Sequence, residues 1–380
     1  MIRFHDLTPP ARRNLRHPIL LLGLLTLLRL AAQPALEPRP EFWRIDGAVN
    51  AIAAHANRAY IGGDFSYVGP DTGPAGIVSR SQGTLLSGYP ELDGVVHVMI
   101  GDGAGGYYVG GAFQVGTQGP VNLVHLLPDF TLDPSWAPNP NNDVRALLLA
   151  DGHLYAGGEF TRIGAITRNR LARFNRTTGA LTPWNPGAGG AVHALLLGPD
   201  RLYVGGFFSN LGGQPRTRIG ALDPVTGAVS PWNPGASGSG SAVRALALAG
   251  NTLYVGGEFA ICGGKPRNRL AALDTGLNAN SATAWNPNAN GTVHAIALSG
   301  PGIVVGGDFS AVGSLNRSRI AQLRVDTGLA VETWDAAADG SVRALVSTPE
   351  GLYAAGQFRN VGGVERRGMV LLNPSSAAVE

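Results

Sequence analysis

Short apolar segments alternate with turn-rich segments along most of this chain. The clearest example lies between residues 191 and 232, where four largely apolar runs occupy residues 192–197, 202–206, 218–222 and 228–232. Gly, Pro, Asp and Thr separate the runs, and short apolar runs bounded by such residues are typical of β-strands. A long helix would need apolar positions at a period of about 3.6 residues, which this stretch lacks. The pattern therefore predicts an all-β protein built from short strands.

The same pattern recurs every 47 to 51 residues, marked by the motif Gly-Gly-x-Phe. The motif occupies residues 62–65, 110–113, 157–160, 205–208, 256–259 and 306–309, and a degraded seventh copy occupies residues 355–358. A unit of four antiparallel strands in about 48 residues has the size of one β-propeller blade. The sequence therefore predicts a seven-bladed β-propeller of four-stranded antiparallel blades.

Tryptophans indicate how the propeller closes. A Trp-bearing strand precedes units three to seven, at Trp136, Trp184, Trp232, Trp285 and Trp334. No Trp follows the seventh unit, whereas residues 41–46 form an orphan copy of that strand with Trp43. We expect residues 41–46 to complete the last blade, so that the ring closes and no sheet edge stays open. An open solenoid, which would leave this strand unpaired, is the alternative.

The paired glycines of the motif end the second strand of each unit. We expect them where the backbone has a positive φ or where a neighbouring chain approaches closely, because either condition favours a residue without a side chain. The Phe that follows is predicted to fill the space between blades.

The first 32 residues have the order of a secretory signal peptide. Residues 1–17 are basic, residues 18–28 are apolar, and Leu30-Ala31-Ala32 offers a small-residue cleavage site. The apolar run is too short for a membrane-spanning helix of about 20 residues, although an uncleaved anchor is the alternative. We therefore predict a signal peptide (1–32), a short linker (33–40) and one propeller domain (41–380). The mature chain is expected in the periplasm, at the cell surface or in the medium, with no membrane span.

Composition narrows the function classes. Glycine accounts for 55 of 380 residues, and the single Cys262 excludes a disulfide scaffold and is predicted to be an inert buried thiol. The formal net charge is +3, but the leader holds five arginines and one aspartate, so the remaining chain is close to neutral. We expect no nucleic-acid partner, since such a partner would favour a strongly basic surface.

The repeat unit also resembles a known family. Its consensus, Val-x-Ala-Leu…Leu-Tyr-Val-Gly-Gly-x-Phe…Arg-x-Arg-Leu-Ala…Leu-Asp…Thr-Gly…Trp-Asn-Pro, closely resembles the bacterial delta-60 repeat, a β-propeller domain of unknown function. It is similar to the repeats of fungal cortical polarity markers and, more distantly, to kelch and galactose-oxidase propellers. The resemblance covers residues 41 to about 373. It implies a propeller fold, and it implies no catalytic residue because the family has none agreed.

One polar residue follows a Val at the same place in the inner strand of every unit. These girdle residues are Asn50, His97, Arg145, His193, Arg244, His294 and Arg343. In a closed ring they would surround the central channel, where their donors could hold an anionic ligand and three histidines could bind a metal. The interposed arginines argue against a bound cation, so we expect no metal and no cofactor.

The girdle residues also have potential partners in their own hairpins, at the x of Gly-Gly-x-Phe. The pairs are Asn50 with Asp64, His97 with Ala112, Arg145 with Glu159, His193 with Phe207, Arg244 with Glu258, His294 with Asp308 and Arg343 with Gln357. Neutralisation within these hairpins is the favoured alternative to ligand binding.

A second basic series precedes the third strand of the later units. It comprises Arg168 and Arg170, Arg216 and Arg218, Arg267 and Arg269, Arg317 and Arg319, and Arg366 and Arg367. These side chains could form a basic surface for an acidic polysaccharide or a partner protein. We favour the alternative that they donate hydrogen bonds to carbonyl groups of irregular turns.

No motif indicates catalysis. The chain lacks Gly-x-Ser-x-Gly, a phosphate-binding loop and His-Glu-x-x-His. We therefore predict a secreted, monomeric binding or scaffold protein whose partner is an unidentified protein or polysaccharide, bound through an open face of the propeller. The alternative is an extracytoplasmic enzyme, for example one that acts on glycans, with its site in the channel.

Overall fold

The computed structural model describes residues 45–55, 58–66, 75–79, 90, 92–116, 121–238 and 240–380. All of them belong to one unit, Pro40–Glu380. The predicted signal peptide (1–32), the linker (33–40) and Trp43 lie outside the described residues. Within the described residues every regular element is a strand, which confirms the all-β prediction. No helix in this part of the chain could span a membrane.

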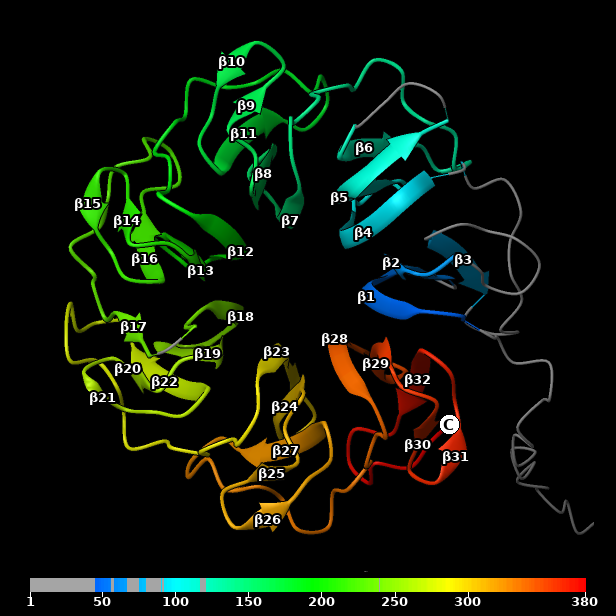
Figure 1. Cartoon of the computed structure of the whole chain (residues 1–380), viewed down its shortest axis with the longest axis vertical. Coiled ribbons are helices and arrows are strands. Elements are labelled where there is room, and N and C mark those ends of the chain that lie inside the picture. Colours follow the sequence, from blue (N-terminus) through cyan, green and yellow to red (C-terminus); the bar gives the residue numbers. More distant parts are fainter. Residues whose placement is uncertain are drawn as a thin grey trace, which may run out of the picture. The chain divides into compact units, whose positions relative to one another are not determined.

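Each repeat forms a small antiparallel sheet of three strands (Figure 1). The inner strands are β1 (Ala48–His55), β4 (Leu92–Gly101), β7 (Val144–Ala150), β12 (Ala191–Leu197), β18 (Val243–Ala249), β23 (Val293–Ser299) and β28 (Ser341–Thr348). The middle strands are β2 (Arg58–Asp64), β5 (Tyr107–Val115), β8 (His153–Gly158), β13 (Leu202–Phe207), β19 (Thr252–Gly257), β24 (Gly302–Gly307) and β29 (Gly351–Gln357). The third strands are β3 (Ala75–Ser79), β6 (Leu123–Leu126), β11 (Leu171–Asn175), β16 (Ile219–Leu222), β22 (Leu270–Asp274), β27 (Ile320–Arg324) and β32 (Met369–Leu372).

The predicted fourth strand does not form, so the four-stranded prediction is wrong at this edge of the sheet. Residues 228–232 contribute only an isolated bridge between Leu222 and Val229. Five other repeats have the matching bridges Leu126 to Leu132, Phe174 to Leu181, Leu273 to Ala282, Leu323 to Ala330 and Leu372 to Val379. In this repeat Pro231 has no N–H to donate to a ladder, but a repeat without a proline before its Trp, that of Ala330, also has a single bridge.

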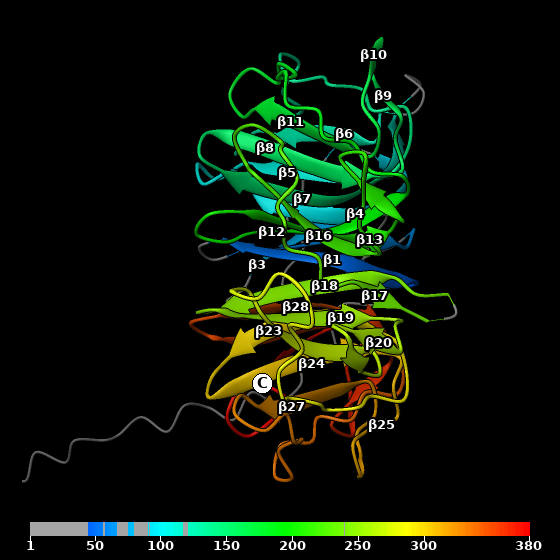
Figure 2. The same cartoon turned by 90° about the vertical axis from the view of Figure 1, so that its left-hand side faces the viewer.

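Short hairpins follow several middle strands. They are β9 (Arg162–Ile163) with β10 (Ile166–Thr167), β14 (Asn210–Leu211) with β15 (Gln214–Pro215), β20 (Ile261–Cys262) with β21 (Lys265–Pro266) and β17 (Ala236–Ser237), β25 (Ala311–Val312) with β26 (Leu315–Asn316), and β30 (Asn360–Val361) with β31 (Val364–Glu365). Figure 2 shows β9, β10, β17, β20 and β25 toward one side of the sheets, which we call the hairpin side. The inner strands begin on this side, since the start of β12 pairs with the end of β13.

Every inner strand is bulged at its girdle residue. In β12, Val192 pairs with Gly206 and Ala194 pairs with Gly205, so His193 is left without a partner residue on β13. The other inner strands show the same register shift at the same place. A bulge leaves one residue out of the ladder and re-aims its side chain. The repeated bulge therefore gives all seven girdle residues the same backbone setting.

Each of the two glycines in the motif is required for a different steric reason. A Cβ added at Gly158 would lie 2.0 Å from the carbonyl oxygen of Asp143, beside the bulge of the same sheet. A Cβ added at Gly157 would lie 2.5 Å from Cγ1 of Val192 in the next repeat. Neither glycine has a positive φ. Close approach is thus the reason for the glycines, and Phe160 after them is fully buried as predicted.

The inner strands contact one another in chain order, and β28 also contacts β1 (Figure 1). A hydrophobic cluster joins these two sheets, with Val49 from the first repeat and Tyr353 and Ala355 from the last. Ile45, at the described end of the predicted orphan strand, belongs to the same cluster. The first and last repeats therefore share one core.

Tryptophans between repeats connect neighbouring sheets. Trp184 packs edge-on against Tyr155 of the preceding repeat, with ring centroids 5.4 Å apart. The hydroxyl of Tyr155 donates a hydrogen bond of 2.9 Å to the carbonyl oxygen of Pro224 in the following repeat. Trp184 is buried, so this contact combines apolar burial with a polar link from one repeat to the next.

Candidate functional site

The girdle residues converge on a cavity of about 260 Å³, which we call the inner-strand cavity. Its polar lining comes from five inner strands and consists of Asn50, His97, Arg145, His193 and Arg244. His294 and Arg343 hold the equivalent positions on β23 and β28 but are not part of the lining. The structure thus brings together five of the seven predicted residues.

Apolar side chains form the rest of the cavity wall. They come from the residues that follow the girdle positions along each strand, among them Leu195, Leu246 and Ile296, each two residues after a girdle position. These three are only partly buried, although they lie in the middle of a sheet protein. The five polar side chains of the lining therefore form a ring near the hairpin side, which we call the collar. The apolar walls lie farther along the strands.

Three predicted hairpin pairs are confirmed. Arg145 Nε donates to Glu159 Oε1 at 2.8 Å, and Arg244 Nε donates to Glu258 Oε1 at 2.7 Å. His294 Nε2 lies 2.8 Å from Asp308 Oδ2. Burial lowers the pKa of His294 despite the raising effect of Asp308. These pairs hold the two cavity arginines in place, and their exposure limits the stability that they contribute.

Three other girdle residues, Asn50, His97 and Arg343, are linked across repeats rather than within hairpins. His97 Nε2 lies 3.2 Å from Asp143 Oδ2, and Arg145 Nη2 donates to the same oxygen at 2.9 Å. The hydrogen bond from His97 lowers the pKa of Asp143, and Arg145 adds to the effect against the cost of burial. Arg343 Nη1 donates to Asn50 Oδ1 at 3.1 Å, which joins the last repeat to the first.

His193 differs from the other girdle residues. Its side chain forms no hydrogen bond or ion pair with any described residue, and Phe207 stands where four other repeats have an acid. Burial lowers its pKa to about 4, and the charges of Arg244, Arg145 and His97 contribute. At neutral pH His193 is therefore an uncharged imidazole with one N–H donor and one free acceptor, set among cations.

The second basic series has a structural role. The guanidinium of the first arginine in each pair donates to the carbonyl oxygen of the residue before it, in Arg168, Arg216, Arg267, Arg317 and Arg366. The second arginine adopts a positive φ in Arg170, Arg218, Arg269 and Arg319. In the last repeat Gly368 takes this position with a φ of 77°, so Arg367 is not equivalent to the other second members. Binding to turn carbonyls, the alternative that we favoured, is confirmed.

A buried acid–histidine cluster escaped the sequence analysis. His125 lies between two carboxylates, with Nε2 3.2 Å from Asp102 Oδ2 and Nδ1 3.0 Å from Asp133 Oδ2. Burial acts to raise the pKa of Asp102, but hydrogen bonds from Ala104, His125 and Gly106 outweigh it and lower that pKa. In two other repeats the residue that pairs with the equivalent tyrosine is an alanine, Ala221 or Ala272. The polar His125 at this position was therefore the signal that the sequence offered.

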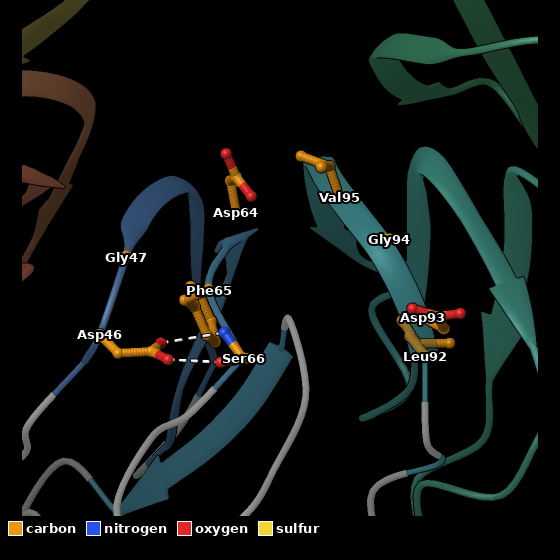
Figure 3. A pocket seen from close by; sticks show the side chains of 9 residues that line it. All are labelled: Asp46, Gly47, Asp64, Phe65, Ser66, Leu92, Asp93, Gly94 and Val95. Carbon is orange, nitrogen blue, oxygen red and sulfur yellow. Dashed lines mark hydrogen bonds between the residues drawn. The ribbon is translucent and has the colours of Figure 1, made fainter.

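A second cavity, of about 520 Å³, lies beside the first two repeats (Figure 3). Asp46, Asp64 and Asp93 line it. Asp46 accepts hydrogen bonds from the backbone N–H and the hydroxyl of Ser66, and Asp93 accepts one of 2.7 Å from Gln114. Among the described residues no cluster of three or more His, Cys, Asp or Glu could hold a metal ion.

Cys262 is buried, as predicted. Burial raises the pKa of its thiol to about 12. A thiol with so high a pKa forms almost no thiolate at neutral pH and is not a nucleophile.

Comparison with known proteins supports the fold. Residues 149–181 match the family described as "Domain of unknown function (DUF5122) beta-propeller". The chain is similar in fold to the crystal structure of a computationally designed protein, Ika8, with 13% identity, a TM-score of 0.56 and coverage of 88% of this chain and 86% of that one. A second designed protein, Ika4, has 14% identity, a TM-score of 0.31 and coverage of 42% and 86%. None of the curated proteins matches. The chain thus carries a bacterial β-propeller repeat of unknown function, which confirms the resemblance inferred from its sequence.

Proposed function

We propose that this chain is a secreted seven-bladed β-propeller that binds its ligand at the girdle residues. The contact of β28 with β1, at the end of an unbroken series of contacts between inner strands, supports a closed ring. The signal-peptide pattern of residues 1–32 supports export to the periplasm, the cell surface or the medium. The linker (33–40) and a single propeller domain (41–380) would follow the leader.

The inner-strand cavity is the observation that carries this proposal. It gathers polar side chains from five inner strands above apolar walls, and ligand sites commonly combine apolar walls with a few convergent polar groups. The ion pairs of Arg145 and Arg244 with Glu159 and Glu258 order the collar before a ligand arrives. Such ordering reduces the entropy lost on binding.

The ion pairs of the acidic side chains next to the collar favour a binding function over a hydrolytic one. A glycan hydrolase needs two carboxyl groups available to act as acid, base or nucleophile. Asp143, Glu159 and Glu258, the acids bonded to girdle residues of the collar, are each engaged by an arginine or a histidine. A protein or polysaccharide partner would reach the collar from the hairpin side.

A ligand screen by thermal unfolding tests the proposal. A ligand that binds only the folded state raises Tm, so the protein should be screened against sugars, amino acids, organic acids and amines. We expect at least one class to raise Tm in the parent and in Arg201→Gln, but not in Arg244→Gln. Arg201 is a suitable control because it pairs with an exposed Asp200 outside the cavity. If every Tm shift survives Arg244→Gln, or if the protein turns over a glycan, the proposed function is wrong.

A further inference from the structure

The lining of the inner-strand cavity contains basic side chains, whereas the acidic side chains that pair with them lie outside the lining. Arg145 and Arg244 are part of its lining, whereas no acidic residue is among the described residues that line it. Glu159 and Glu258 bond to the Nε of these arginines, Asp143 also bonds to Nη2 of Arg145, and Glu258 also pairs with Nη2 of Arg244. A guanidinium has five N–H donors, so each arginine keeps donors beyond those that its acid occupies.

His193 lies between these two arginines in the order of the inner strands, β7, β12 and β18. Because it has no hydrogen-bond partner among the described residues, its N–H is available to a ligand. Burial is the main reason why the pKa of His193 is lowered, and the positive charges of Arg244 and Arg145 add to the effect. An anion placed there would meet two guanidinium groups and one neutral donor.

The apolar walls indicate which groups the ligand carries besides its anionic group. Leu195, Leu246 and Ile296 follow the collar along their strands, remain partly exposed and line the same cavity. Burying apolar groups of a ligand against them is favourable. The volume of about 260 Å³ would hold about nine groups the size of a water molecule, at ~30 Å³ each.

We propose that this cavity binds a small organic monoanion with an apolar body, such as a short-chain carboxylate. The carboxylate lies against Arg145, His193 and Arg244, and the hydrocarbon chain lies along Leu195, Leu246 and Ile296. This inference rests on the proposed function, because it names the ligand class of the same girdle site.

Calorimetric titration of the purified protein with four probes tests this inference. The probes are hexanoate, hexylammonium, hexanol and acetate. We expect saturable binding of hexanoate, with hexylammonium and acetate at least tenfold weaker, since one lacks the anion and the other lacks the apolar body. Leu246→Gln should weaken hexanoate and hexanol alike. Arg244→Gln should weaken hexanoate at least tenfold and leave hexanol unchanged, whereas Arg201→Gln should change neither.

The outcomes separate the two proposals. If hexylammonium or hexanol binds the parent as tightly as hexanoate, or if Arg244→Gln leaves hexanoate binding unchanged, the organic-anion inference is wrong. Failure of hexanoate to bind the parent at millimolar concentration also overturns it. In each of these cases the proposed function stands or falls by the wider screen, where another ligand class can still depend on Arg244. Circular dichroism of each variant shows whether the β-sheet structure is retained.

Discussion

Val192 of one repeat packs into the space that Gly157 of the preceding repeat leaves empty. A Cβ at position 157 would lie 2.5 Å from Cγ1 of that valine, closer than two carbon atoms can approach. Six repeats have a glycine here, and the corresponding residue of the last repeat is Ala355. Ala355 belongs to the cluster that also contains Val49 of the first repeat. Contact between sheets is therefore set repeat by repeat, through one small residue and one valine.

Gly157→Ala should destabilise the protein, because it overfills a packed contact. Overpacking costs about 1–3 kcal/mol in the free energy of unfolding, measurable by urea denaturation. Val192→Ala in the same chain should recover part of the loss by removing the clashing methyl groups. If Gly157→Ala leaves stability unchanged, the close packing of sheets described above is wrong. Ala355→Gly makes the opposite change at the equivalent position of the last repeat. It should also destabilise the protein, by about 0.5–1 kcal/mol, because glycine is less favourable than alanine within a strand.

His125→Leu should destabilise the protein at neutral pH, because it removes the hydrogen-bond partner of Oδ2 of the buried Asp102. Removing a hydrogen bond to a charged group costs about 1.5–3 kcal/mol, and urea unfolding at pH 7 measures the loss. The folded-state pKa values of Asp102 and Asp133 lie below 3.8. Their stabilisation is therefore fully present above pH 3.8 and disappears as the pH falls through the folded values.

The difference between the parent and His125→Leu should consequently shrink at pH 2.5. His153→Leu is the control, since among the described residues the His153 side chain bonds only to the carbonyl oxygen of Asp151 in an exposed turn. It should change stability little at either pH. A difference between the parent and His125→Leu that is the same at both pH values would contradict the ionic role of the cluster.

Closure of the ring can be tested at the hydrogen bond between Arg343 and Asn50, whose donor and acceptor atoms lie 3.1 Å apart. A chain carrying Asn50→Cys and Arg343→Cys should be joined within one molecule by a short bismaleimide, and its mobility on a denaturing gel should change. Cys262 should not interfere, because its thiol is buried and has a pKa of about 12. Each single-cysteine variant is the control. Cross-links only between separate molecules would argue for an open array.

Export can be tested by fractionation of expressing cells and sequencing of the mature N-terminus. If residues 1–32 are a signal peptide, the mature protein should begin near Gln33 and appear outside the cytoplasm. Replacing Leu21 and Leu24 by Arg in the apolar run should retain the uncleaved chain inside the cell. Cytoplasmic protein with an intact N-terminus in the parent would contradict secretion.

The repeat predicted much of this architecture because strand length, turn residues and small-residue positions are local properties. The convergence of Asn50, His97, Arg145, His193 and Arg244 on one cavity followed from their common position in the repeat. The bulge at each of these residues could not be predicted. A bulge depends on the register between two paired strands, and the sequence of one strand alone does not determine that register.

The missing fourth strand and the cluster around His125 show two further limits. Apolar residues such as Val229 indicated a strand, but only one bridge forms there, and the same is true of repeats with and without a proline before the Trp. Asp102 and Asp133 are brought to His125 by tertiary folding. Spacing within a repeat does not predict such contacts, because they depart from the pattern that the repeats share.

The most direct test of the account is an NMR titration of the His193 ring with and without hexanoate. Without ligand, His193 should titrate with a pKa of about 4. Bound hexanoate should raise that pKa, because a carboxylate beside the ring favours the protonated imidazole. The ring resonances of His125 and His153, outside the cavity lining, should stay unchanged. An unchanged titration of His193 at saturating hexanoate would contradict the girdle as the binding site of the organic anion.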